Sequence, residues 1–175
     1  MGSERMSKAT LDRLVVEPGG GAPVRVLKML HKVEAFHLDG RLLVLEGEIP
    51  PGQLILPHTH TREDECAYVL SGELTYQIGE EVRAAPAGTY VVKPRGIPHA
   101  FWNATSKPAR VMEMHVPATM DRFYDELAEI FAEHEPGTHR WQEAFDGLSK
   151  RHGITQHWDR VADLNRRYGV GASPS

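Results

Sequence analysis

Two stretches decide the fold of this chain: GQLILPHTHTREDECAYVLSG, residues 52–72, and GTYVVKPRGIPHAFWN, residues 88–103. In both, glycine and proline separate short runs of β-branched, aliphatic and aromatic residues. The same texture extends outward from Val24 to Pro117, with turn residues about every 8–12 positions. Such spacing is typical of an all-β sandwich or barrel.

Three histidines and one glutamate stand out within these stretches. His58 and His60 are two positions apart, so both imidazoles face the same side of an extended strand. Glu65 follows after a short turn on the next strand, and His99 comes from a later strand after a Pro-x-Gly turn. A lone histidine is more often a surface or core residue. Imidazoles and a carboxylate converging from three strands instead predict a site for a divalent transition metal.

The same residues resemble the two signature motifs of the cupin superfamily. The first motif, G-x5-H-x-H-x4-E-x6-G, is met by Gly52, His58, His60, Glu65 and Gly72. The second, G-x5-P-x-G-x2-H-x3-N, is met by Gly88, Pro94, Gly96, His99 and Asn103. The resemblance implies a double-stranded β-helix, also called a jelly-roll or cupin barrel, that holds a single metal. The ligands it implies are His58, His60, Glu65 and His99.

A looser pattern, a proline followed by an acidic and aromatic helix over Pro117–Glu126, is similar to the single-domain quercetin-dioxygenase-like cupins. This similarity implies a dioxygenase that acts on an aromatic or enol-type small molecule chelated by Fe, Ni, Mn or Zn, with Glu65 as the catalytic base. Two alternatives stay open. One is a non-redox cupin (an isomerase, decarboxylase or polyketide cyclase), and the other is a small-molecule-binding module without turnover.

The chain divides into three predicted segments: an N-terminal tail over residues 1–22, the barrel over 23–117 and a C-terminal α-helical extension over 118–175. In the extension the apolar period changes from two to about 3.6, which predicts helices that pack on the barrel. Thr119 is the expected N-cap of the first of these helices, and Gly169 the expected end of the last. The first expected barrel strand is Val24–Met29.

Strand alternation predicts a largely apolar substrate pocket around the metal. The side chains in phase with the predicted ligands are Leu54, Leu56, Ala67, Val69 and Phe101. Because none of the in-phase positions carries lysine or arginine, phosphorylated ligands are disfavoured, whereas Phe101 can stack on a ring. Glu113 and His115 share a phase on the last barrel strand. We expect this pair to face outward, with the alternative that they face the pocket.

Composition excludes several other classes of protein. Lys and Arg number 20 against 24 Asp and Glu, a net charge of −4, so there is no electrostatic case for a nucleic-acid partner. No apolar run approaches the roughly 18–20 residues of a membrane span, and no secretory signal is apparent. Cys66 is the only cysteine. We therefore expect a cytoplasmic protein with a small-molecule substrate, and the resemblance implies a homodimer.

Overall fold

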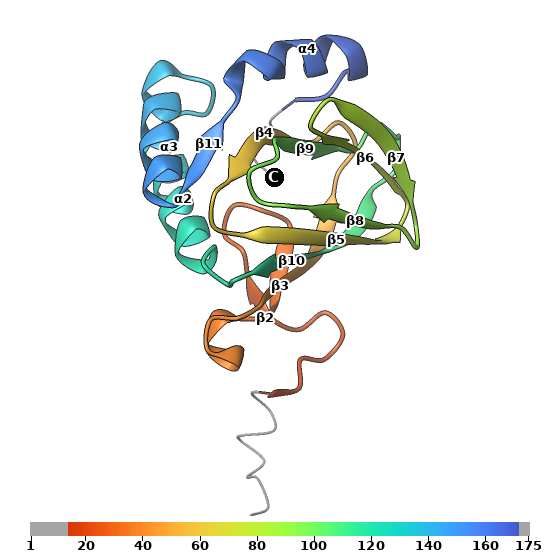
Figure 1. The fold of residues 1–175 in the computed structure, drawn as a ribbon, viewed down its shortest axis with the longest axis vertical. Helices are drawn as coiled ribbons and strands as arrows, with labels where there is room; N and C mark the ends of the chain where they lie inside the picture. The colour runs from red at the N-terminus through yellow and green to blue at the C-terminus, as the bar shows by residue number, and fades with distance from the viewer. Residues whose placement is uncertain (1–13, 172–175) are drawn as a thin grey trace, which may run out of the picture.

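The computed structural model describes residues 14–171, so residues 1–13 of the predicted tail lie outside the described part of the chain. Two antiparallel sheets face one another across an apolar core (Figure 1). The six-stranded sheet has the order β1 (Ala22–Pro23), β2 (Met29–Val33), β3 (Leu43–Ile49), β10 (Ala109–Val116), β5 (Asp64–Ser71), β8 (Tyr90–Lys93). The five-stranded sheet has the order β11 (Ile154–Gln156), β4 (Leu54–His60), β9 (His99–Trp102), β6 (Glu73–Ile78), β7 (Glu81–Pro86). Successive strands alternate between the two sheets from β3 to β6 and again from β7 to β11. The predicted jelly-roll fold is confirmed.

The expected strand Val24–Met29 is wrong in its position. Residues 25–28 form turns, and the strand starts at Met29 and continues to Val33. The turn is closed by a hydrogen bond from the Val24 amide to the Met29 carbonyl, 2.9 Å long. Gly47 on the neighbouring strand makes this path possible, because a Cβ there would lie 2.1 Å from the Lys28 carbonyl oxygen. The segment predicted as a strand therefore forms a turn, and Gly47 on the neighbouring strand permits the close approach of the two backbones.

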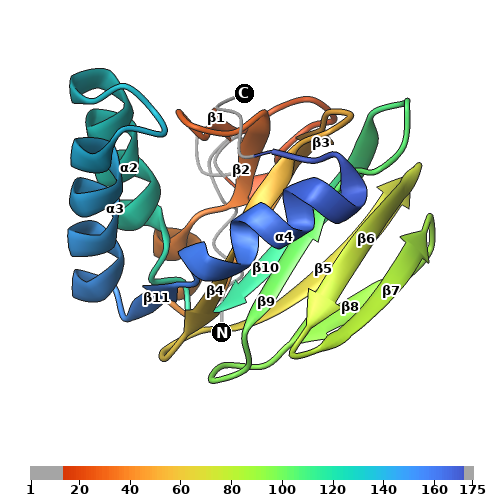
Figure 2. The ribbon, with the colours of Figure 1, turned by 90° about the horizontal axis from the view of Figure 1, so that it is seen from above.

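Three helices follow the barrel: α2 (Asp121–Glu133), α3 (His139–Arg151) and α4 (Trp158–Tyr168). A short 3-10 helix, η1 (Ala35–Leu38), precedes β3. Figure 2 shows α2 and α3 side by side at one end of the sandwich, and α4 crossing the outside of the five-stranded sheet. There α4 packs against buried residues of β4 and β9: Leu54, Ala100 and Trp102. None of the described helices is long and apolar enough to cross a membrane.

The predicted end of the last helix at Gly169 agrees with the structure, whereas the predicted N-cap of the first helix at Thr119 is wrong. The cap position of α2 is Met120, while the Thr119 hydroxyl donates a hydrogen bond to Glu63. Gly169 ends α4 with a φ of 65°, a left-handed conformation that glycine adopts without steric cost. Thr119 is thus directed into the barrel mouth rather than to the helix.

Strand β11 was not predicted. It lies between α3 and α4 and pairs with β4, where Ile154 is opposite His60 and Gln156 opposite His58. Gly153 precedes it with a φ of 76°, and a Cβ there would lie 2.6 Å from the Thr61 hydroxyl oxygen. Through β11, the C-terminal extension becomes part of the sheet beside the two histidines.

Candidate metal centre

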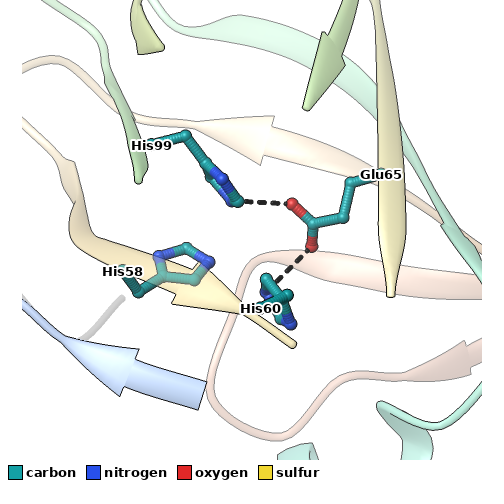
Figure 3. A group of neighbouring side chains, drawn as sticks. All are labelled: His58, His60, Glu65 and His99. Atoms are coloured by element: carbon teal, nitrogen blue, oxygen red, sulfur yellow. Dashed lines mark ion pairs between the residues drawn. The ribbon is translucent and has the colours of Figure 1, made fainter. Parts of the chain in front are cut away.

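The structure brings together the four residues that the motifs predicted as metal ligands. His58 and His60 come from β4, Glu65 from β5 and His99 from β9, and His58 lies opposite His99 in the β4–β9 register. One ligand atom of each lies within 4.8 Å of the others. Figure 3 shows the three rings and the carboxylate directed toward one centre.

Backbone carbonyls set the orientation of two of these rings. His58 Nδ1 lies 2.6 Å from the Leu56 carbonyl oxygen, and His99 Nδ1 lies 3.1 Å from the Ile97 carbonyl oxygen. Because a carbonyl oxygen only accepts, each Nδ1 carries the proton and each Nε2 keeps a lone pair. Burial, reinforced by neighbouring His99 and His60, holds the pKa of His58 well below its usual value. The ring is therefore neutral, as metal binding requires.

The third ring is oriented by a carboxylate that sequence reasoning missed. His60 Nδ1 donates to Glu63 Oε2 over 2.9 Å, and both side chains are 1% exposed. The other Glu63 oxygen accepts the hydrogen bond from Thr119. Glu63 was assigned only to a turn, but its spacing of three residues from His60 in a tight connection was the available signal. Carboxylates that accept from the second nitrogen of a ligating histidine are common in metal sites.

The inward-facing nitrogens fit a metal ion. His60 Nε2 lies 3.3 Å from Glu65 Oε1, and His99 Nε2 lies 2.9 Å from Glu65 Oε2. Neither Nε2 finds a partner of hydrogen-bond geometry within residues 14–171, although both are buried. Buried polar atoms are rarely left unsatisfied. A cation between these nitrogens and the carboxylate would satisfy all of them, and imidazole and carboxylate are suitable ligands for Fe, Ni, Mn and Zn.

Two cross-strand neighbours hold the Glu65 carboxylate from either side. In the sheet register Glu65 is opposite Lys93 on β8 and opposite His115 on β10. Lys93 Nζ lies 3.1 Å from Glu65 Oε2, and His115 Nδ1 lies 2.8 Å from Glu65 Oε1. Burial alone would raise the pKa of Glu65, but Lys93 and His115 bring it well below its usual value. The carboxylate is thus ionised at neutral pH.

Lys93 also pairs with Glu113 on β10, its Nζ 2.6 Å from Glu113 Oε2. Burial opposes the charge of Lys93, but Glu113 and Glu65 together raise its pKa above the usual value. A buried cation is therefore held between two carboxylates. This row of charges crosses three neighbouring strands of the six-stranded sheet.

Two expectations about the pocket wall are corrected here. Glu113 and His115 do not face outward: they are 4% and 3% exposed and line the cavity. Hydrophobic alternation gave the wrong orientation because Met112 and Met114 occupy the outer face, while the barrel interior is polar near the four-residue cluster. The wall also contains a cation, Lys93, although no lysine or arginine was expected. Its inward phase follows from its pairing with Glu65.

A cavity of about 700 Å³ extends from His58, His60 and Glu65 toward the helices. Leu54, Leu56 and Phe101, which were predicted to line a substrate pocket, border this cavity. Ala67 and Val69 are fully buried in the apolar core and do not border the cavity, because they follow Glu65 along β5 away from the opening. The structure adds lining residues from α2, α3, β11 and α4, which the barrel motifs alone did not indicate.

Comparison with known protein families identifies the domain that carries the four-residue cluster. Residues 45–115 match the family model described as the cupin domain, a range that contains all four predicted ligands. The chain therefore contains a cupin domain. The chain is 27% identical over 123 residues to the quercetin 2,3-dioxygenase of Bacillus subtilis strain 168. The alignment covers 69% of this chain but only 36% of that relative, so the chain matches about a third of the relative's length.

Solved structures from Thermotoga maritima and Thermus thermophilus are similar to the chain. One is described as a predicted oxalate decarboxylase from Thermotoga maritima, with 21% identity, a TM-score of 0.49 and coverage of 51% of this chain and 78% of that chain. The other is a protein of Thermus thermophilus, with 29% identity, a TM-score of 0.45 and coverage of 61% of this chain and 93% of that chain.

Proposed function

We propose that this cupin is a metal-dependent dioxygenase that acts on an aromatic or enol-type small molecule bound to the metal through a pair of oxygens. The observation that carries the proposal is the set of inward-facing Nε2 atoms beside an ionised carboxylate, at the end of an apolar cavity. The partial similarity to a quercetin 2,3-dioxygenase supports it.

In this proposal His58, His60, Glu65 and His99 hold one divalent transition metal. When bound, such a metal polarises substrate oxygens and assists the reaction of an electron-rich substrate with O₂. The protein contributes orientation, because hydrogen bonds to Leu56, Ile97 and Glu63 fix the three imidazoles before any ligand arrives.

Glu65 is the proposed catalytic base, taking the proton of the substrate hydroxyl onto its carboxylate. The lowered pKa leaves the carboxylate free to accept a proton at neutral pH, but it also makes Glu65 a weak base. Transfer is therefore favoured for acidic hydroxyls such as enols and phenols rather than for simple alcohols. His115 and Lys93, in contact with the two carboxylate oxygens, orient Glu65 for this transfer.

The overall reaction balances without an external reductant. Cleavage of one carbon–carbon double bond of the enolate by O₂ gives two carbonyl groups, so both oxygen atoms end in the organic product and the substrate supplies all four electrons. The apolar walls, among them Leu56 and Phe101, keep water from the reacting carbons. This chemistry requires only a metal, O₂ and a substrate of the proposed class.

Oxygen uptake tests the proposal. Protein loaded in turn with Fe(II), Ni(II), Mn(II) or Zn(II) is given flavonols, 1,3-diketones and catechols in an oxygen electrode, and the products are identified by mass spectrometry with ¹⁸O₂. We expect uptake with at least one metal and incorporation of both ¹⁸O atoms. The Glu65→Gln variant, compared at equal metal occupancy, should lose far more turnover than metal.

The other outcomes identify the alternatives. Turnover under anaerobic conditions would identify the protein as a non-redox isomerase, decarboxylase or cyclase. Saturable ligand binding without any product would assign a binding module. Unchanged kcat in metal-loaded Glu65→Gln would reject Glu65 as the base while leaving it as a ligand.

We also propose that the protein is a cytoplasmic homodimer and that the chain divides into the three segments predicted from its sequence. Light scattering on the purified chain measures its oligomeric state, and fractionation of the source cells measures its location.

A further inference from the structure

The cavity is larger than a metal-chelating group requires. An internal cavity of about 150 Å³ already accommodates a benzene ring, whereas this one has about 700 Å³. Its lining divides into a barrel end, which includes His58, His60 and Glu65, and a helical end built from α2, α3, β11 and α4. The helical end lies outside residues 45–115, which carry the match to the cupin domain.

The helical end is strongly aromatic. Its ring-bearing residues come from three helices: Phe123, Tyr124, Phe131, Trp141, Phe145 and Trp158. Trp141 lies at the centre of the group, with ring centroids 5.6 Å from Phe131, 5.2 Å from Phe145 and 5.7 Å from Trp158, all edge to face. Walls of this kind bind flat, apolar groups.

Two polar atoms in this wall have no hydrogen-bond partner among the described residues. The buried Trp141 Nε1 lacks a hydrogen-bond partner among the described residues, whereas Trp158 Nε1 donates to Asp146 Oδ1 over 2.7 Å. Gln156 Oε1, also unpartnered within residues 14–171, belongs to the same lining. A donor and an acceptor are therefore available for a ligand at a mainly apolar wall.

Charge is confined to the barrel end. The charged residues of the lining are Glu65, Lys93 and Glu113, and the lysine is already paired with both carboxylates. No lysine or arginine of the described lining is left to neutralise an anionic group beside the helices. A charged tail would be desolvated there without compensation.

We propose that the helical extension forms a second binding subsite, centred on Trp141, for an uncharged aromatic tail of the ligand whose oxygen pair binds at the metal. The inference rests on the proposed function, and it narrows the ligand to a molecule with a chelating head and a neutral aromatic tail. Trp141 and Phe131 are then specificity-determining residues.

Three matched probes distinguish binding of the chelating head from binding of the aromatic tail. Acetylacetone carries the chelating oxygens alone, benzoylacetone adds one phenyl ring, and butylbenzene carries the ring without the oxygens. Binding is measured by calorimetry to Zn(II)-loaded protein and, for butylbenzene, also to metal-free protein. We expect benzoylacetone to bind at least about tenfold more tightly than acetylacetone, because burial of a phenyl group is worth that factor. A benzoylacetone with a para-carboxylate should lose this gain.

Two variants test the assignment of the wall. Trp141→Leu and Phe131→Leu should each weaken benzoylacetone by about tenfold and leave acetylacetone within about twofold. Tyr90→Leu is the control, because Tyr90 is 65% exposed on β8 and does not line the cavity. If Trp141→Leu fails to fold, Phe131→Leu alone decides.

The outcomes of these binding experiments test the aromatic subsite independently of the proposed dioxygenase activity. Equal affinities for acetylacetone and benzoylacetone, together with no binding of butylbenzene, would overturn the subsite even if oxygen is consumed. Butylbenzene binding to metal-free protein that is weakened in both variants would support the subsite even if no substrate consumes oxygen. A loss of affinity for acetylacetone as large as that for benzoylacetone would also overturn it.

Discussion

The orientation of the individual ring nitrogens determines what the histidine cluster can bind. Each ring of His58, His60 and His99 has its Nδ1 hydrogen-bonded to an oxygen and its Nε2 directed to a common centre. Removal of one Nε2 should therefore cost metal affinity without disturbing the other two. The site is prepared by the backbone and by Glu63 rather than assembled by the metal.

His99→Ala should weaken binding of Zn(II) or Ni(II) at least about tenfold, because one nitrogen ligand is lost. Competition with a chromophoric chelator measures the affinity. His139→Ala is the control, since that side chain is 82% exposed on α3. Parent-like metal affinity in His99→Ala would show that the ligand assignment is incorrect.

Glu63→Gln should weaken metal binding by about 10–100-fold, the range typical of residues that orient a ligating histidine. The isosteric amide keeps the volume but removes the charge that accepts from His60 Nδ1. The second readout is the tautomer of His60, measured by ¹⁵N NMR in metal-free protein. Glu143→Gln, exposed on α3, serves as the control. An unchanged tautomer together with unchanged affinity would contradict this role.

Neighbouring strands carry the charges of the site in a row. Lys93 on β8 contacts Glu65 on β5 and Glu113 on β10, and all three side chains are nearly inaccessible to solvent. Loss of one partner of a buried ion pair leaves an uncompensated charge, and this costs more than loss of both. Substitution of a charged residue on one of these three strands should therefore disturb the charge balance on the other two.

Lys93→Met should destabilise the metal-free protein by about 3–5 kcal/mol, because Glu113 and Glu65 lose their buried cation. The double variant Lys93→Met/Glu113→Leu should recover a large part of that loss. Urea unfolding followed by circular dichroism measures both. If the double variant is no more stable than Lys93→Met alone, Lys93 and Glu113 do not balance each other's charge in the cavity wall.

The molecule as a whole should lose stability on acidification. The pKa values of His58 and Glu65 lie well below their usual values of 6.5 and 4.5, and that of exposed Asp64 is lowered to about 2 by its hydrogen bonds with Arg95. For each group the unfolded chain binds protons at a higher pH than the folded one, so the stabilising contribution is present at high pH and lost as pH falls.

Metal-free protein should therefore lose free energy of unfolding first below about pH 6.5, as His58 protonates in the unfolded state, and more steeply below about 4.5. Urea titrations from pH 8 to pH 3 measure the trend, with Asp64→Asn separating the surface contribution. A stability that stays constant or rises between pH 7 and pH 4 would contradict the assignment. Bound metal should move the loss to lower pH as long as it stays bound.

Local spacing in the sequence determined the barrel and the meeting of His58, His60, Glu65 and His99. These features follow from strand period, turn residues and motif spacing, which act over a few residues at a time. The end of α4 was predictable for the same reason, since Gly169 ends this helix.

Only the tertiary structure decided the rest. Which way Glu113 and His115 face depends on the sheet register and on a polar interior, and neither is visible in hydrophobic alternation. The roles of Glu63, Lys93 and β11 depend on contacts between segments distant along the chain. The aromatic end of the cavity depends on how three helices pack against a barrel. Long-range pairing determines such features, and no local pattern encodes it.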